Sequence, residues 1–321
     1  MTAVGLEFRH VARRYGDFVA VNDLSLTIPA GKICVLVGPS GCGKTTSLKM
    51  VNRLIEPTSG QILVGGQDVM AQDPIELRRG IGYVIQQVGL LPHLTVGENV
   101  GIVPRLLGWE RPRISSRVDE LLALTGLAPL TYRDRYPAQL SGGERQRVGV
   151  ARALAADPPL MLMDEPFAAV DPIVRERLQN ELLRLQEQLA KTIVFVTHDI
   201  DEAIKLGDLV AVLQVGGVLA QYGPPSEILA TPASDFVAQF VGADRGLKRL
   251  SLTRVTDLDL EPVPADYAPQ PGQPLLEPQT TLKDALSMML DADVSAGVVI
   301  DSKRRVVGLV TYEKIAAALH P

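Results

Sequence analysis

The stretch ICVLV at residues 33–37 runs directly into GPSGCGKT at residues 38–45, and this junction decides the fold. Five consecutive apolar residues predict a strand buried on both faces, as in a parallel sheet. The eight residues that follow fit G-x-x-x-x-G-K-[ST] in full, and a helical pattern comes next, which is the context this motif requires. Its glycines let the backbone wrap an anion, while the helix start adds its positive dipole end. The sequence therefore predicts a phosphate-binding loop.

The side chains of this loop have distinct expected roles. Lys44 neutralises β- and γ-phosphates, and the Thr45 hydroxyl can ligate Mg²⁺. Cys42 is either a small residue at a variable position or a redox-sensitive thiol. The predicted nucleotide-binding residues of this segment are Gly38, Pro39, Ser40, Gly41, Cys42, Gly43, Lys44, Thr45 and Thr46.

Strand-length apolar runs recur along the first three quarters of the chain, with helical patterns between them. This alternation predicts α/β architecture with a parallel sheet. Gly65-Gly66 predicts a tight hairpin turn. Between residues 96 and 155 helical periodicity replaces the strands, which indicates an inserted helical subdomain. The further strand-like runs are residues 81–85, 160–163, 193–197 and 209–213.

Two acids, Asp164 and Glu165, follow the apolar run at residues 160–163. Ligands of open parallel sheets bind beyond the carboxyl ends of the strands. Asp164 is therefore predicted to hold Mg²⁺ directly or through water, and Glu165 to polarise the water that attacks a γ-phosphate. The alternative is an exposed acidic turn.

A second anion-binding device stands at Ser141-Gly142-Gly143, where a serine and two glycines open a helix. One nucleotide needs only one phosphate loop. The second device therefore predicts a nucleotide sandwiched between two copies of the chain.

Composition bounds the class of protein. The chain has 321 residues, 46% hydrophobic and 21% charged, which is typical of globular proteins. A net charge of -5 argues against bulk nucleic-acid binding. Only Cys34 and Cys42 are present, so we expect a reducing compartment and no disulfide scaffold. No apolar run approaches the roughly 18 residues of a membrane helix, so a partner would supply any membrane part.

Residues from about 6 to 241 resemble the ATPase subunit of ATP-binding cassette (ABC) transporters. The resemblance implies an α/β P-loop NTPase fold of the ABC type, with a mixed-sheet core, an antiparallel β subdomain and the inserted helical subdomain. ATP and Mg²⁺ are the implied cofactors. Leu140–Glu144 resembles the family signature, with Glu144 where Gln is commonest, a change that we expect to be tolerated.

The resemblance also assigns site residues. Glu165 and His198 would be catalytic, and Thr45, Gln86 and Asp164 would hold the metal. Outside the phosphate loop, the implied ATP contacts are Tyr15, Gln86, Ser141, Gly142, Gly143 and Asp171. Three alternatives stay open: Tyr15 as a plain surface aromatic, Gln87 instead of Gln86, and Asp171 as a helix cap that also signals across a dimer.

Within the family, three segments resemble the importer branch for quaternary-amine osmoprotectants such as glycine betaine, carnitine, choline and proline betaine. This resemblance implies a homodimer at the cytoplasmic face of the cell membrane, bound to integral membrane permease subunits. It also implies an extracytoplasmic solute-binding protein or domain, and no nucleic acid. The rival functions are transport of an amino acid or a sugar, a non-transport ABC ATPase, and a regulatory nucleotide-binding protein. The three segments are residues 48–54, 90–96 and 240–250.

We expect the ATPase domain at residues 1–241, a Pro-rich connector at 242–279 and a last module at 280–321. The module resembles a single cystathionine-β-synthase-type (CBS) repeat of helix, strand, turn, strand and helix. Lys314 stands where nucleotide-binding repeats carry an acid, which weakens the case for ribose binding there. The module is either a sensor of ionic strength, membrane charge or a nucleotide, or a tail that stabilises a dimer.

Overall fold

The computed structural model describes residues 2–86, 89–168, 170–264 and 267–319. The chain divides into two compact units, Met1–Pro224 and Pro225–Pro321, each with its own hydrophobic core. Among the residues described, no helix is both long and apolar enough to cross a membrane.

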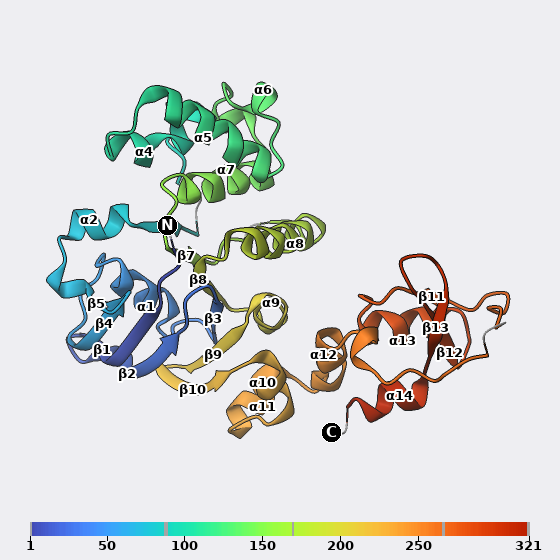
Figure 1. Ribbon diagram of the computed structural model, residues 1–321. Helices are drawn as coiled ribbons and strands as arrows, with labels where there is room; N and C mark the ends of the chain where they lie inside the picture. Colours follow the sequence, from blue (N-terminus) through green and yellow to red (C-terminus); the bar gives the residue numbers. More distant parts are fainter. Residues whose placement is uncertain (1, 87–88, 169, 265–266, 320–321) are drawn as a thin grey trace. The chain divides into compact units, whose positions relative to one another are not determined.

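A six-stranded sheet forms the centre of the first unit, in the order β10-β9-β3-β8-β7-β6 (Figure 1). All neighbours pair in parallel except β10, which runs antiparallel to β9 at one edge. Every residue of β3, β7 and β8 is buried, as a sheet covered on both faces requires. The strands are β3 (Ile33–Val37), β6 (Ile81–Val84), β7 (Leu160–Asp164), β8 (Thr192–Thr197), β9 (Leu209–Gln214) and β10 (Val218–Gly223).

A second sheet is antiparallel, in the order β2-β1-β4-β5. Alternate residues of β1, including Leu6, Phe8 and Val11, are buried in the core that this sheet shares with the central one. Gly65 and Gly66 form the predicted tight turn between β4 and β5. The strands are β1 (Leu6–Tyr15), β2 (Phe18–Ile28), β4 (Ser59–Val64) and β5 (Gln67–Asp68), followed by η1 (Val69–Ala71) and α2 (Pro74–Arg79).

The predicted helical subdomain is confirmed. Its helices are grouped together in green in Figure 1, and the described residues between β6 and β7 contain no strand. They are α3 (Val96–Val100), α4 (Ile102–Leu106), α5 (Arg111–Leu124), α6 (Pro129–Tyr132), η2 (Pro137–Gln139) and α7 (Gly142–Leu154).

Two helices connect strands of the central sheet, α8 (Pro172–Leu189) and α9 (Ile200–Leu206), and α1 (Lys44–Val51) leads from β3 to β4 of the second sheet. α8 begins at a Pro in its first turn and buries Leu178, Leu182 and Leu185, the apolar stripe that its spacing predicts.

The second unit contains the expected succession of helix, strand, turn, strand and helix, here α13, β12, β13 and α14. A short strand, β11, adds to β12 in parallel. The range expected as a connector also contributes to this core, through Leu250, Val255 and Leu276. The elements are α10 (Pro225–Ala230), α11 (Asp235–Val241), α12 (Arg245–Leu252), η3 (Val255–Asp257), β11 (Leu275–Leu276), α13 (Leu282–Asp291), β12 (Ala296–Ile300), β13 (Val306–Thr311) and α14 (Tyr312–Ala317).

Candidate functional site

The loop between β3 and α1 has a backbone that only glycine can follow at two positions. Gly38 has φ 154°, and a Cβ there would lie 2.2 Å from the carbonyl oxygen of Leu213. Gly43 has φ 91°, and its Cβ would lie 2.3 Å from the carbonyl oxygen of Ala20. The glycines of the motif are therefore required by backbone conformation and by close contact with neighbouring strands.

Lys44 points back into the loop. Its Nζ donates hydrogen bonds to the carbonyl oxygens of Gly38 at 2.7 Å and Pro39 at 3.0 Å. The side chain is buried, so the ammonium is held where the loop curves. Pro39, Ser40 and Gly41 complete the loop, and Thr46 follows in the first turn of α1. This arrangement places a cation and a helix N-terminus together, the pattern that binds phosphate.

Cys42 is fully buried, and its Sγ lies 3.7 Å from Lys44 Nζ. Cys42 and Cys34 are both free thiols. Burial raises the pKa of Cys34, which favours the unreactive protonated form. Because Cys42 is enclosed by the loop, it is a packing residue here, and the redox interpretation stays a prediction.

The acid at the end of β7 contacts the loop directly. The Thr45 hydroxyl donates to Asp164 Oδ1 at 2.8 Å. Burial raises the pKa of Asp164, and this effect outweighs the opposing hydrogen bond from Thr45. A hydroxyl and a carboxylate are the hard oxygen ligands that Mg²⁺ prefers, and Mg²⁺ commonly uses one or two carboxylates together with substrate phosphates. The two side chains therefore fit the predicted metal.

Glu165 is the meeting point of the predicted catalytic group. Gln86 Nε2 donates to its Oε2 at 3.1 Å, and His198 Nδ1 lies 3.4 Å from the same oxygen. Glu165 itself adopts φ 44°, a left-handed backbone conformation that residues other than glycine rarely adopt. Its backbone N–H donates to Val196, which fixes the turn beside β8. Three residues from separate strand ends thus converge. The alternative residue Gln87 lies outside the described residues, so the structure does not compare it with Gln86.

Ser141 caps α7, and Glu144 completes a capping box with it. The Ser141 N–H donates to Glu144 Oε2 at 2.7 Å, and the Tyr132 hydroxyl donates to Oε1 at 2.7 Å. These hydrogen bonds lower the pKa of Glu144, and both carboxylate oxygens are hydrogen-bonded within the chain. Gly142 and Gly143 occupy the first turn of the helix, where backbone N–H groups face outward.

Asp171 caps α8, accepting a hydrogen bond from the Ile173 N–H at 3.0 Å. The start of α8 lies against the start of α7, because a Cβ on Gly143 would come within 3.0 Å of Val174. Asp171 is therefore close to the signature segment of its own chain. The contacts of the described residues do not link either one to the Glu165 group.

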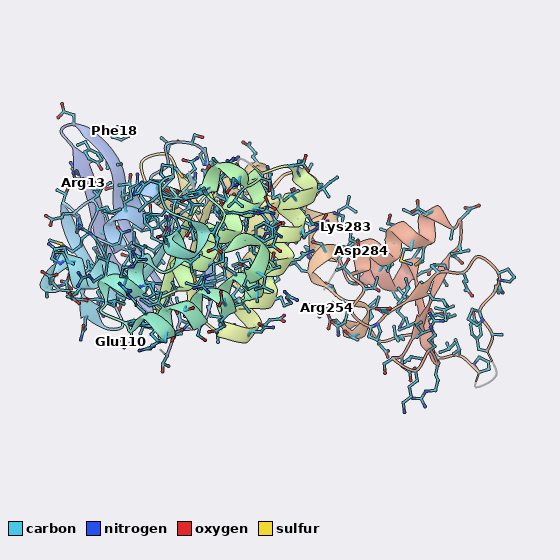
Figure 2. All side chains as sticks on the ribbon, turned by 90° about the horizontal axis from the view of Figure 1, so that it is seen from above. Arg13, Phe18, Glu110, Arg254, Lys283 and Asp284 are labelled. Carbon is cyan, nitrogen blue, oxygen red and sulfur yellow. The ribbon has the colours of Figure 1, made fainter. Side chains whose placement is uncertain are left out.

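Tyr15 lies at the end of β1, where it pairs with Phe18 at the start of β2. Its ring is 44% exposed, and the Arg13 guanidinium lies 4.3 Å from the ring centroid. Arg13 is in turn held by the carbonyl oxygen of Glu56 at 2.9 Å. Figure 2 labels Arg13 and Phe18 on this hairpin. Tyr15 thus has one ring face backed by a cation, a contact that the sequence analysis missed.

A second missed contact lies behind His198. Glu202 of α9 is buried and accepts a hydrogen bond from Gln179 of α8 at 3.0 Å. The available signal was its position four residues before the buried Leu206 on one helix face. A glutamate on an apolar face indicates a buried partner, but the sequence alone does not identify Gln179 as that partner.

Two family models match the chain: "ABC transporter" over residues 21–168 and "CBS domain" over residues 269–321. The chain is 50% identical over 293 residues to the osmoprotectant import ATP-binding protein OsmV of Salmonella typhimurium, covering 91% of this chain and 74% of that protein. It is 47% identical over 313 residues to the glycine betaine/carnitine/choline transport ATP-binding protein OpuCA of Bacillus subtilis, covering 97% and 79%.

Among solved structures, the chain is similar to the ATP-binding cassette MJ0796, determined as a dimer in a post-hydrolysis state bound to ADP and phosphate. The TM-score is 0.60 at 33% identity, over 68% of this chain and 98% of that one. Fold, phosphate loop and high identity over most of the length agree: the chain belongs to the ATP-binding proteins of the ABC transporter family.

Proposed function

We propose that this protein is the ATP-hydrolysing subunit of a membrane importer for quaternary-amine osmoprotectants. The observation that carries the proposal is the convergence of Gln86 and His198 on one oxygen of Glu165, next to the Thr45–Asp164 pair. A phosphate loop alone supports nucleotide binding. A carboxylate held beside that loop by an amide and an imidazole supports hydrolysis.

In this proposal Glu165 accepts a proton from the attacking water, and His198 holds the carboxylate in place and contacts the γ-phosphate. Lys44 and the N-terminus of α1 neutralise the phosphates. Thr45, Asp164 and Gln86 would hold Mg²⁺, which when bound neutralises charge on the phosphates. Tyr15 stacks on the adenine ring.

The active unit is proposed to be a homodimer. Ser141, Gly142 and Gly143 present N–H groups at the start of α7, and a second copy of the chain would use them on the nucleotide held by the first. Asp171, close to this segment, would transmit the state of one site to the other. Closure of the dimer drives the permease subunits, and hydrolysis reopens it.

The helical subdomain carries a surface suited to the permease. An open groove of about 710 Å³ is lined by three arginines, by the acids Glu98 and Asp134, and by the single tryptophan of the chain. Arg113 lies over the Trp109 ring at 3.6 Å and lines a neighbouring hollow rather than this groove. We propose that the groove takes a cytoplasmic segment of the permease with acidic and apolar side chains. The three arginines are Arg105, Arg111 and Arg133.

The solute is assigned by similarity to OsmV and OpuCA, and a solute-binding protein or domain outside the cell would deliver it. The complex would work at the cytoplasmic face of the membrane. The alternatives are an importer of another solute, such as an amino acid or a sugar, and an ABC ATPase without a transport role. Reconstitution with the permease and binding protein separates them, because only the proposed function predicts uptake of glycine betaine, carnitine or choline driven by ATP.

Replacing Glu165 by Gln tests the chemistry. The amide keeps the hydrogen bond geometry but cannot accept a proton, so we expect ATP affinity to stay within about twofold while turnover falls by about 10²-fold or more. Steady-state phosphate release and equilibrium nucleotide binding measure the two effects. Lys205→Ala, a surface change outside the site, is the control. Undiminished turnover in the Gln variant would contradict the assignment.

A further inference from the structure

Glu202 is a buried acid to which the proposed reaction gives no role. It is 7% exposed, and burial raises its pKa above the ordinary value, against the opposing effect of hydrogen bonds from Thr197 and Gln179. Burying a carboxyl group is unfavourable unless its oxygens are hydrogen-bonded. The reason for a buried carboxyl group at this position is therefore to be sought in the residues that Glu202 contacts.

Its partners bracket His198. Thr197 lines the same small cavity as Glu202, where its hydroxyl acts to lower the pKa of the Glu202 carboxyl group, and Thr197 Oγ1 accepts the Asp199 N–H at 3.0 Å. Asp199 Oδ1 in turn accepts the Glu202 N–H at 3.3 Å. The residues before and after His198 are therefore both linked to Glu202, Asp199 through the backbone N–H of Glu202, so the segment that carries the histidine is anchored to the start of α9.

Gln179 connects this network to α8. Its Nε2 donates to Glu202 Oε1 at 3.0 Å, between two side chains that are both buried. Gln179 lies two turns along the helix that Asp171 caps, the helix that starts beside the signature segment. One hydrogen bond between buried side chains thus links α8 to the start of α9, next to the segment that carries His198.

Glu202 also borders the proposed catalytic site. Glu202, Glu165 and His198 line one small cavity of about 30 Å³, together with Asp199 and Arg175. Arg175 donates to the Val170 carbonyl oxygen at 3.2 Å and, with Asp199, is one of the charged groups that act on Glu202. The network therefore lies directly behind the pair that would activate water.

We propose that Glu202 and Gln179 are positioning residues for His198, and that they couple α8 to the histidine. The inference rests on the proposed function, in which His198 acts on the Glu165 carboxylate and the γ-phosphate. Neither residue touches the reacting atoms. Their effect is exerted on turnover, because the imidazole has to be oriented during the reaction, whereas nucleotide affinity depends mainly on the phosphate loop.

The experiment measures kcat, ATP affinity and Tm for the full chain and for variants of it. Gln179→Leu removes the donor, and we expect kcat to fall about tenfold while ATP affinity changes less than about twofold. Glu202→Gln is expected to act in the same direction. The double variant Gln179→Glu/Glu202→Gln exchanges donor and acceptor and should restore kcat to within about threefold of the unchanged chain.

Lys205→Ala is the matched control. Lys205 of α9 pairs with Glu176 of α8 at 3.8 Å, so it links the same two helices near the surface without reaching Thr197. We expect its kcat to be unchanged. In a His198→Ala background, Gln179→Leu should cause no further loss, because the residue on which it acts is gone.

The proposal is overturned if Gln179→Leu keeps full kcat, if Lys205→Ala reproduces the loss, or if the exchanged pair restores Tm but not kcat. Failure of the proposed function gives a different result. A fully active His198→Ala or Glu165→Gln variant overturns the assigned chemistry, and this inference with it, whatever Gln179 does.

Discussion

Glu144 shows how one residue can depart from a family pattern while its surroundings absorb the change. A carboxylate at the signature position would bring negative charge toward a bound phosphate. Here both oxygens accept hydrogen bonds, from the Ser141 N–H and from the Tyr132 hydroxyl. The charge also lies in the first turn of α7, where the helix dipole favours an anion. The predicted tolerance of this substitution thus has a structural reason.

Removing the Tyr132 hydroxyl tests this reason through pH. A group with a lowered pKa contributes stability above its unfolded value, 4.5 for Glu144, and that contribution is lost as the pH falls through the folded pKa. We therefore expect Tyr132→Phe to be less stable than the unchanged chain at neutral pH, with the difference in the free energy of unfolding closing as the pH falls below the ordinary pKa of 4.5. Thermal unfolding across this range measures it. A gap that does not depend on pH would assign the effect to packing.

Tyr15 offers a test of adenine stacking. We expect Tyr15→Ala to weaken ATP binding about two- to tenfold, because the stacked ring contributes roughly 0.5–1.5 kcal/mol. Tyr15→Phe keeps the ring and is the control, with affinity near that of the unchanged chain. Both are measured by nucleotide titration. Equal affinity of all three proteins would support the plain surface aromatic instead.

Contacts within local motifs could be predicted from the sequence, whereas the contact between Gln179 and Glu202 of separate helices could not, and the roles of the site residues stay predictions. Lys44, Thr45 and Asp164 follow from a loop motif and a strand end. Gln179 could not be found in this way, because its partner Glu202 lies on another helix and is brought close only by packing. Roles that rest on a second copy of the chain stay predictions.

At the scale of elements, α8 combines a structural cap with a proposed signal. Asp171 caps it through a side-chain oxygen, and an asparagine would supply the same oxygen without the charge. We expect Asp171→Ala to cost about 1 kcal/mol of stability and Asp171→Asn to cost little. If the charge also communicates between sites, Asn lowers ATP turnover at unchanged Tm. Full turnover in the Asn variant would leave capping as its sole role.

Elements with a clear hydrophobic pattern were predicted well. A strand buried on both faces appears as a continuous apolar run, and a helix buried on one face appears as apolar residues at helical spacing. Residues 33–37 form β3, and residues 96–155 contain the predicted helices. The Pro-rich range was harder. Its prolines favour extended backbone, yet Leu276 forms β11 and packs into the second core, a consequence of long-range pairing with β12 that composition does not reveal.

At the scale of the whole molecule, two units with separate cores predict two unfolding events. Calorimetry of the full chain should show two unfolding transitions. ATP should raise the Tm of only the transition that belongs to Met1–Pro224. Nucleotide at about a hundred times Kd adds roughly 2.7 kcal/mol to the unit that binds it. The Glu165→Gln variant prevents turnover during the scan. A single transition that ATP shifts as a whole would show that the units unfold together.

The order of strands in the central sheet also governs how the chain is made. β3 is an early strand, but its two neighbours, β8 and β9, begin only at Thr192 and Leu209. At roughly 5–20 residues per second, a ribosome needs on the order of ten seconds or more to synthesise the intervening chain. Throughout that interval β3 has neither of the strands, β8 and β9, with which it pairs in the folded protein. The strand that precedes the phosphate loop is thus among the first parts of the central sheet to be synthesised and among the last to be paired on both edges.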